Sequence, residues 1–463
     1  MKRHLLLIIM MAFPVTFFAQ ESATTLKTVY QNGAFSLFKE VADANEGNVC
    51  FSPVSVQLAL SMVQNGAANN TLAQMRKLLG TSDFTEKEVN EYNSSLSKKI
   101  SYRPEIDYDQ LEYYDNKDDF FNAYNVAYPQ CELANGVWTR QDVILLDSFV
   151  SLIKEFYDAG FGNVDFTSLE GIQVINDWVN QKTHGLIKKI YDEPQSEDLA
   201  VVLANALYFK GHWTVEFDKN ETKPDSFHLG NGTAVMTDMM LTRGYFNTNL
   251  SDKFRTITLP YGVGDFSMTI FLPTSGTGLP ELTADDWREG VKVKNRYTPH
   301  NVRMPKFVID GNYDLVPLLK NLGMTDAFDP YWADFYRMRD LPMFINRVFQ
   351  LSKIAVDEVG TEAAAVTVFD LEDSAAPDDF EDFKDFNVNR PFYFTIEHRK
   401  LETVLFAGRV TDVQGPRVQD LTVINEITET PVTSTLYDLS GRRLNAIPER
   451  GIYIQNGKKY IVR

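Results

Sequence analysis

Residues 199–209 form a nearly continuous apolar run, interrupted only by Asn205. A strand with one solvated face alternates apolar and polar residues, whereas a run that is apolar throughout is typical of a central strand covered on both faces. We therefore predict a layered domain in which this segment lies at the middle of a sheet, between two other layers.

Helix signals are concentrated before this run. Ser52-Pro53 predicts a helix start, because Ser caps the free backbone N–H groups and Pro is tolerated in the first turn. Thr167 with Glu170 predicts a second helix that opens on a capping box. The first half of the chain is therefore expected to be mainly helical.

Strand signals dominate the second half. Phe266, Met268, Ile270 and Leu272 alternate with other residues, as in a β-strand. This order of helices before strands predicts the α+β class. Because residues 20–415 contain no Gly/Ser linker and no repeat, we expect one large domain there.

The charge and cysteine content exclude several classes of protein. With 45 Lys and Arg against 63 Asp and Glu, the formal net charge is −18, which argues against a nucleic-acid partner. Cys50 and Cys131 are too few for a disulfide framework or a four-cysteine zinc site. We expect Cys50 to be a buried, unreactive thiol; a disulfide with Cys131 in an oxidising compartment is the alternative.

Motifs of enzymes are missing from the sequence. It contains no Gly-x-Ser-x-Gly elbow and no His-Glu-x-x-His motif, and its six histidines show no ligand spacing. We predict no catalytic residues, no metal site and no cofactor. An enzymatic function would require a nucleophile–base pair that the sequence does not show.

The N-terminus has the pattern of a signal peptide. Lys2 and Arg3 precede the apolar run 5–13, and Ala19 offers a small residue for cleavage. The apolar run is too short to span a bilayer before Pro14 interrupts it. We predict a signal peptide over residues 1–19 and an extracellular or cell-surface location.

The C-terminus changes character after residue 415. Residues 416–430 are expected to be a linker, and 431–463 a small β module, because short strand-like runs alternate there with turn residues. Its YDLSGRR (437–443) and GIYI (451–454) pieces resemble the sorting domains of the bacterial type IX secretion system. The resemblance implies an outer-membrane secretion machinery as a partner; a folded stub without that role is the alternative.

Residues 102–128 contain six Tyr and many Asp without clean periodicity. We expect a surface insertion, with a binding surface for an unknown partner as the alternative.

A run of small side chains near residue 360 is unusual. The strand-like segment 348–356 leads into 357–368, where Ala, Gly, Thr and Val predominate, and residues 369–386 are then strongly acidic. Small side chains without helix caps suit a segment that has to enter a packed sheet, where a bulky or charged residue would clash or be buried.

Five motifs now point to a family: NVCFSPVS (48–55), NALYFKGHW (205–213), EVGTEAAA (358–365), NRPF (389–392) and FAGRV (406–410). Their types and order resemble the serpins, over almost all of residues 20–415. The resemblance implies the serpin fold, with helices packed on three β-sheets, an exposed reactive loop and a monomeric protein.

The resemblance also assigns candidate site residues. The hinge of the reactive loop would comprise Glu358, Gly360, Thr361, Glu362, Ala363, Ala364, Ala365 and Thr367. The breach and shutter of the main sheet, where it opens, would include Lys306, Trp213, Asn205, Ser52, Ser55 and Gln350. Glu358 and Lys306 match the family's ion pair at the top of the sheet. Gln350 stands where the family usually has His, which is expected to change how readily the sheet opens.

The function implied by the resemblance is suicide inhibition of proteases. Counting from the hinge places the reactive bond at Ser374-Ala375, although the long loop leaves Ala375-Ala376 and Phe369-Asp370 open. A small residue before the bond favours elastase-like or subtilisin-like serine proteases, Phe369 would suit a chymotrypsin-like enzyme, and papain-like cysteine proteases stay open. A non-inhibitory serpin that binds a ligand or acts as a scaffold is the alternative; the absence of Pro and bulky residues over 360–365 favours inhibition.

Overall fold

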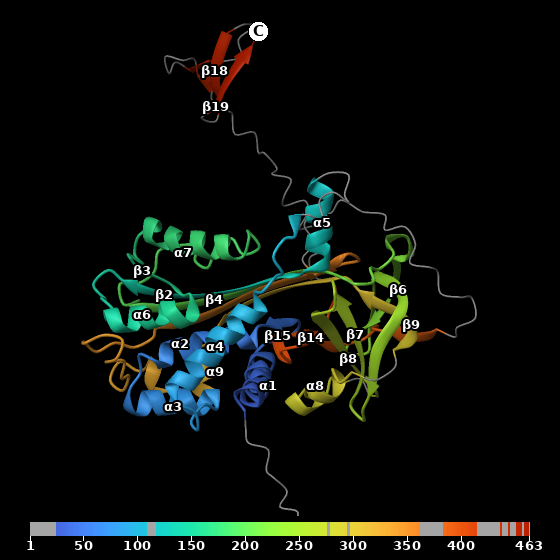
Figure 1. Cartoon of the computed structure of the whole chain (residues 1–463), viewed down its shortest axis with the longest axis horizontal. Helices are drawn as coiled ribbons and strands as arrows, with labels where there is room; N and C mark the ends of the chain where they lie inside the picture. The colour runs from blue at the N-terminus through green and yellow to red at the C-terminus, as the bar shows by residue number, and fades with distance from the viewer. Residues whose placement is uncertain are drawn as a thin grey trace, which may run out of the picture.

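The computed structural model describes residues 25–108, 117–275, 278–293, 297–361 and 383–413, together with short strands between 436 and 462. The predicted signal peptide 1–19 and linker 416–430 lie outside the described residues. Figure 1 shows a body of helices and sheets in which sheet strands run between helical layers.

The α-helices are α1 (Leu26–Ala44), α2 (Pro53–Gln64), α3 (Asn69–Leu79), α4 (Glu86–Ile100), α5 (Lys117–Ala127), α6 (Asp147–Tyr157), α7 (Leu169–Lys182), α8 (Ala284–Gly290) and α9 (Val316–Asn321). The strands of the body are β1 (Val49–Phe51), β2 (Gln130–Arg140), β3 (Gly160–Val164), β4 (Val201–His212), β5 (Lys223–His228), β6 (Ala234–Leu250), β7 (Phe254–Tyr261), β8 (Phe266–Pro273), β9 (Thr298–Pro305), β10 (Phe307–Asp314), β11 (Arg347–Val356), β12 (Gly360–Thr361), β13 (Lys384–Asn387), β14 (Phe392–His398) and β15 (Thr403–Val410).

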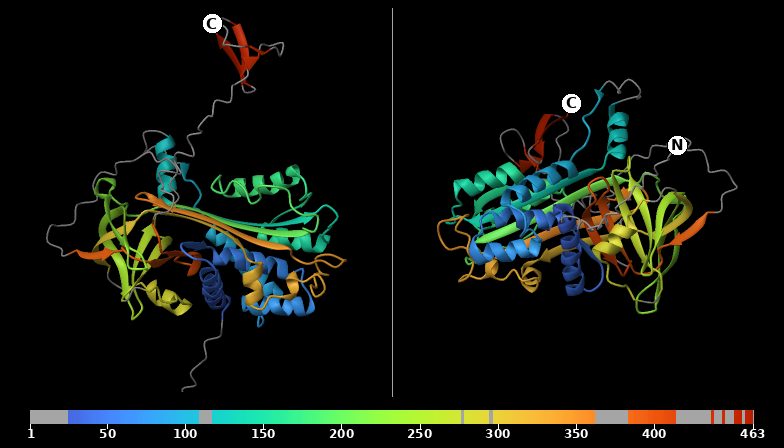
Figure 2. Two further views of the ribbon diagram at one scale, coloured as in Figure 1. Left: turned by 180° about the vertical axis from the view of Figure 1, so that it is seen from behind. Right: turned by 60° about the horizontal axis from the view of Figure 1, so that its bottom comes forward.

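The main sheet has six strands in the order β10-β11-β12-β4-β2-β3, and the apolar run of the sequence is its central strand β4. Leu207 and Phe209 of β4 pack in one core with Leu58 of α2, on the inner face of the sheet. On the opposite, outer face, Ala204 and Ala206 pack against Trp178 of α7. Figures 1 and 2 show α7 on one side of this sheet and α1–α4 on the other. The predicted burial of the strand on both faces is confirmed.

The other strands of the body form two sheets that share the long strand β6. One runs β1-β15-β14-β8-β7-β6, and β6 then continues into a second sheet with β5, β9 and β13. With the main sheet, these make the three sheets expected in the body, and the α+β class is confirmed.

A separate small sheet lies near the C-terminus, with the strand order β17 (Arg443–Leu444), β16 (Leu436–Tyr437), β18 (Gly451–Gln455) and β19 (Lys458–Val462). All its pairings are antiparallel. The predicted small β module is therefore present, and its role in sorting stays a prediction.

The two helix starts predicted from sequence have different outcomes. Ser52 is the N-cap residue of α2, although its hydroxyl makes no capping hydrogen bond. The capping box at Thr167 is wrong: the N–H and the hydroxyl of Thr167 both donate to Asp165 Oδ1, at 2.9 and 2.6 Å. Ser168 caps α7 instead, its Oγ accepting the Gly171 N–H at 3.0 Å. The Asp165 side chain, which competes for Thr167, shifts the helix start by one residue.

Both cysteines are free thiols and fully buried, so the disulfide alternative is wrong. Burial raises the pKa of Cys50 to about 12, and it also raises the pKa of Cys131. Because the thiolate is the reactive form, both are unreactive in the folded protein, as predicted for Cys50.

The described parts of the predicted insertion, residues 102–108 and 117–128, reach the surface as expected, with Tyr102 and Tyr108 67% and 61% exposed. Its second part is helix α5, which the irregular composition did not predict and which projects from the body in Figure 1. The helix is held at its base, where the carbonyl oxygen of Ala127 accepts the Val263 N–H at 2.9 Å. Gly262, at φ 49°, permits this approach, because a Cβ there would lie 2.2 Å from the same oxygen.

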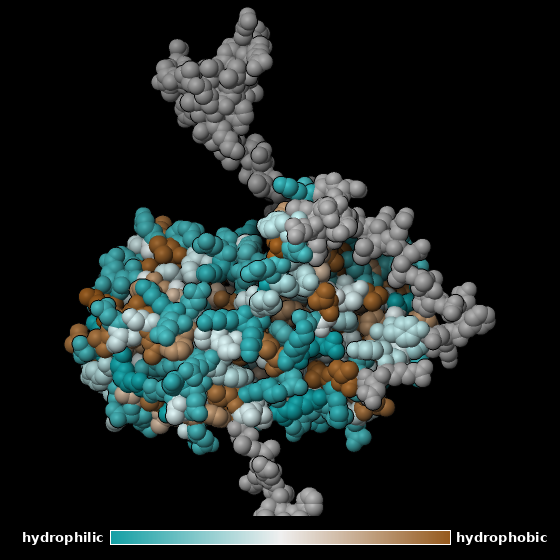
Figure 3. All heavy atoms as spheres, viewed as in Figure 1, coloured by the Kyte–Doolittle hydropathy of each residue, from teal (hydrophilic) through white to brown (hydrophobic). Residues whose placement is uncertain are grey.

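The surface is mainly hydrophilic on the face shown in Figure 3, where hydrophobic residues lie in small separate groups. Among the helices that the structure describes, none is long and apolar enough to cross a membrane.

Candidate functional site

The main sheet is split between β11 and β4. At the lower end of the two strands, residues 347–351 pair in parallel with 202–206. At the upper end, β12 lies between them, with Thr361 paired to Val356 on one side and to Gly211 on the other, antiparallel to both strands. A two-residue strand thus separates two long strands that pair directly further down.

Between these two paired regions the ladder is incomplete. Within the described part of the sheet, residues 352–355 of β11 and 207–210 of β4 have no pairing with each other or with β12. Backbone N–H and C=O groups are strong hydrogen-bonding groups that proteins normally pair inside a sheet. The site is therefore a ready position for one additional strand, already begun by β12.

Trp213 holds the upper end of this opening. Its ring stacks on Tyr261 with a centroid distance of 4.3 Å and an interplanar angle of 14°. Its Nε1 donates to the carbonyl oxygen of Asp357 at 2.9 Å, and its backbone N–H donates to Val359 at 2.9 Å. One residue, through its side chain and its backbone, thus fixes the turn through which the chain leaves β11 and enters β12.

Lys306 and Glu358 form an ion pair beside this turn, with 2.5 Å between Nζ and Oε1. The Thr222 hydroxyl donates to the same Oε1 at 2.7 Å. Burial raises the pKa of Glu358, but the hydrogen bonds from Lys306 and Thr222 outweigh it, so the pKa lies below its usual value. With the two side chains only 21% and 6% exposed, the pair is largely shielded from water.

Asp357 makes the turn itself. Its Oδ1 accepts the N–H groups of Val359 and Gly360, at 2.9 and 3.1 Å. Burial raises the pKa of Asp357 above its usual value, more than these hydrogen bonds lower it. The turn therefore directs Gly360 and Thr361 into the sheet. It requires the burial of the Asp357 carboxyl group, which is unfavourable.

Gly360 and Thr361 fit their positions closely. A Cβ on Gly360 would lie 2.1 Å from the Gly211 carbonyl oxygen, so only glycine fits there without a shift of the backbone. Thr361 is 2% exposed, and its Oγ1 lies 2.5 Å from the Tyr261 hydroxyl. Gly360 and Thr361, which follow Glu358 in the predicted hinge, are thus inside the sheet in this structure.

A polar cluster lies under the part of the sheet where β11 and β4 pair directly with each other. The Ser55 hydroxyl donates to Asn205 Oδ1, while Asn205 Nδ2 donates to the Ser55 carbonyl oxygen at 2.9 Å and to Asn135 Oδ1 at 2.6 Å. Gln350 pairs with Asn205 across the two strands and is fully buried. Neither polar atom of the Gln350 amide has a hydrogen-bond partner among the described residues, and the same holds for the Ser52 hydroxyl.

Several predicted site residues lie outside the described residues. These are the rest of the hinge, Glu362, Ala363, Ala364, Ala365 and Thr367, and the reactive-bond residues Ser374 and Ala375. Among the residues that the structure does describe, sequence reasoning missed Tyr261, Thr222 and Asn135. No local signal marks them, since each belongs to the site only through contacts between distant strands.

Within the described residues, no group of three or more His, Cys, Asp and Glu is placed to hold a metal ion. A cavity of about 720 Å³ lies elsewhere, lined by residues of α1, α8 and strands β6, β7, β8 and β14. One lining residue is Glu397, 2% exposed, whose carboxylate accepts hydrogen bonds from Ser267, Thr269 and Thr395, each at 2.7 Å.

We expect Glu397 to make stability depend on pH. Burial raises its pKa to about 7, more than the three hydroxyls lower it, so folding takes up a proton between about pH 4.5 and 7. The free energy of unfolding keeps the full contribution of this group below the unfolded pKa. It falls by about 3 kcal/mol as pH rises from there to 7. Between pH 5 and pH 8, the midpoint of thermal unfolding should fall less for Glu397→Gln than for the wild type. Glu289→Gln, exposed in the same cavity, should behave like the wild type, and identical profiles for all three proteins would contradict the assignment.

Most of the chain is similar to proteins of one family. A family model described as "Serpin (serine protease inhibitor)" matches residues 29–413. Human Serpin B13 is 29% identical over 390 residues, which cover 81% of this chain and 96% of that protein. Serpin-Z4 of Hordeum vulgare is 34% identical over 381 residues, covering 79% and 90%. The native-state crystal structure of tengpin, a thermophilic serpin, matches with a TM-score of 0.69 at 28% identity, over 85% of this chain and 96% of that one.

Proposed function

Because the chain belongs to the serpin family, whose members are generally protease inhibitors and not enzymes, we propose that it is a suicide inhibitor of proteases. A protease attacks the reactive loop and forms an acyl-enzyme through its nucleophile. Before hydrolysis is complete, the cut loop enters the main sheet as a new strand. About 14 residues at ~3.3 Å each carry the attached enzyme some 45 Å, and distortion of its active site ends catalysis.

The observation that carries this proposal is the two-residue strand β12 in the split sheet. Its pairing is antiparallel to β11 and β4, so a longer strand entering at the same place would replace one parallel ladder by two antiparallel ladders. Antiparallel pairing is slightly more stable per residue, and the unpaired groups of 352–355 and 207–210 would gain partners. Insertion is therefore favourable, and the native state persists because a barrier separates it from the inserted one.

The register of β12 tells which loop residues would face which neighbours. Continued down the strands, it sets Ala363 and Ala365 opposite Phe209 and Leu207, which point into the core. Small side chains are needed there, because the core beneath the strands is already filled. Glu362, on the outer face, would stand opposite Lys210.

The same register sets Thr367 opposite Asn205 and Gln350. A hydroxyl delivered to this point would bond with the Gln350 amide, whose two polar atoms have no hydrogen-bond partner among the described residues. An unsatisfied buried polar group costs about 1–3 kcal/mol, so part of the driving force would come from this residue.

For the target we propose a serine protease of the elastase-like or subtilisin-like kind, cleaving at Ser374-Ala375. The small Ser374 suits a shallow pocket, and the acidic residues Asp370, Glu372 and Asp373 before the bond favour enzymes with basic grooves. We further propose export through residues 1–19 to the cell surface or outside the cell, with the C-terminal module engaging a secretion machinery.

The test is a denaturing gel of the purified protein mixed separately with pancreatic elastase, subtilisin, chymotrypsin and papain. A band at the summed mass that survives denaturation, with a released peptide starting at Ala375, is the expected result for elastase or subtilisin. Loop cleavage without such a band, and without a rise in the thermal stability of the cleaved protein, would instead favour a non-inhibitory binding or scaffold serpin.

A further inference from the structure

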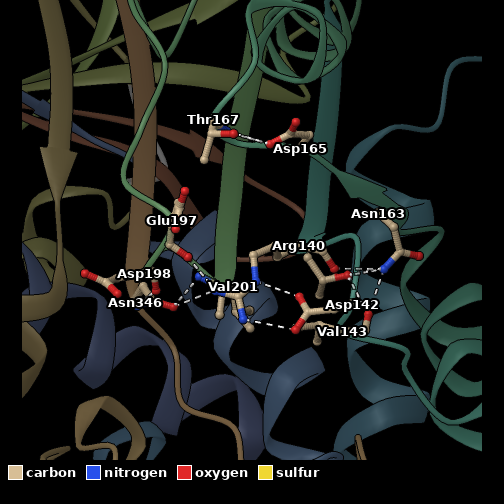
Figure 4. Close-up of polar contacts among 12 residues, drawn as sticks. Arg140, Asp142, Val143, Asn163, Asp165, Thr167, Glu197, Asp198, Val201 and Asn346 are labelled. Atoms are coloured by element: carbon tan, nitrogen blue, oxygen red, sulfur yellow. Dashed lines mark hydrogen bonds and ion pairs between the residues drawn. The ribbon is translucent and has the colours of Figure 1, made fainter.

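Asn346 bridges the lower end of the split between β11 and β4. It comes directly before β11, and its Oδ1 accepts the N–H groups of Ala200 and Val201, at 2.9 and 3.0 Å. Its Nδ2 donates to the Asp198 carbonyl oxygen at 3.2 Å, and its backbone N–H donates to Val201 at 3.2 Å. Figure 4 shows Asn346 reaching the segment that leads into β4.

The segment that Asn346 holds is attached to the other half of the sheet. The Arg140 backbone N–H donates to the Ala200 carbonyl oxygen at 2.9 Å, and the Arg140 guanidinium reaches 2.5 Å from the Glu197 carbonyl oxygen. When the sheet opens, residues 197–201 therefore stay with β2 and β4, whereas Asn346 moves with β11. All the side-chain hydrogen bonds of Asn346 therefore join the half of the sheet that contains β11 to the half that contains β4.

An entering strand reaches these bonds last. In the register fixed by β12, Thr367 falls opposite Gln350 and Asn205, whereas Leu371 falls opposite Asn346 and Val201. The Val201 N–H cannot bond fully to both the Asn346 side chain and an inserted strand. Complete insertion therefore breaks the Asn346 bridge, and insertion that stops at Thr367 leaves it intact.

We propose that Asn346 is a positioning residue that acts as a clasp: its bonds to 198–201 resist the final stage of strand insertion and so set its rate. This inference rests on the proposed function, because it assumes that a strand enters between β11 and β4. The clasp stabilises the native state and contributes nothing to the inserted state.

The experiment follows annealing of a synthetic peptide of the chain's own sequence 362–371 to the intact protein, by native gel and mass spectrometry. Asn346→Ala should anneal about tenfold faster than the wild type, which corresponds to about 1.4 kcal/mol of activation free energy. Asn346→Asp keeps an acceptor for Ala200 and Val201 and should stay close to the wild-type rate. The matched control is Asn163→Ala, which removes bonds to Thr139 and Val143 at the same end of the sheet but outside the opening.

A second readout separates a clasp from a general structural role. Asn346→Ala should lower the thermal midpoint of the intact protein but not of the loop-cleaved protein, whereas Asn163→Ala should lower both. Equal annealing rates for Asn346→Ala and wild type, or equal destabilisation of the intact and cleaved forms, would overturn the clasp. If the wild type takes up no peptide and gains no stability on loop cleavage, the proposed function itself fails.

Discussion

Thr361→Arg should abolish the denaturant-stable complex and turn the protein into a substrate that its target protease cleaves and leaves. Thr361 is 2% exposed inside the sheet and lies against the Tyr261 hydroxyl. A guanidinium at this position would have to be buried inside the sheet, which costs several kcal/mol. The loop would be held outside the sheet, and the acyl-enzyme would hydrolyse before insertion began.

Gel densitometry of the complex against cleaved inhibitor measures this outcome. Thr361→Ser, which keeps a small side chain and the hydroxyl, is the matched control and should form the complex as the wild type does. A full yield of complex from Thr361→Arg would refute strand insertion as the mechanism.

Ser374→Arg should change which protease is trapped. An Arg side chain does not fit the shallow pocket of an elastase-like enzyme but fits a deep acidic pocket of the trypsin type. We expect the association rate with elastase to fall by at least about a hundredfold and trypsin to become a target. Progress curves with the two enzymes measure both rates, and mass spectrometry of the released peptide should show Ala375 at its start.

This variant also tests the other positions for the bond. If cleavage occurs at Phe369-Asp370, Ser374→Arg leaves the trapping of chymotrypsin almost unchanged and Phe369→Ala removes it. If it occurs at Ala375-Ala376, the released peptide starts at Ala376 and inhibition of elastase survives the change at Ser374.

The fold could be predicted where burial leaves a strong pattern in the sequence. The apolar run 199–209 indicated a strand covered on both faces because nearly every position is buried. The start of α7 was missed by one residue, because the choice between Thr167 and Ser168 depends on the Asp165 side chain. Helix α5 was missed because its polar and aromatic residues have no regular spacing and its base is fixed by the distant Gly262 turn.

The candidate site was predictable only in part for a similar reason. Gly360 and Thr361 belong to a recognisable motif, and the structure sets both inside the sheet. Tyr261 and Asn346 carry no motif, and each contributes through contacts with strands far away in sequence. Gln350 could be noted as a departure, but only the packed cluster shows that its two polar amide atoms have no hydrogen-bond partner in the described part of the chain.

The split in the main sheet has the width of one strand, and β12 already occupies its upper end. Once a loop fills the rest, both neighbouring strands are paired along their length and no second vacancy exists. Under the proposed function, each molecule would be consumed by a single encounter, whether that encounter succeeds or ends in simple cleavage. The number of protease molecules that can be inhibited would then be limited by the number of copies of the protein. A cell facing more protease would have to make more inhibitor, because a faster-reacting inhibitor still could not be reused.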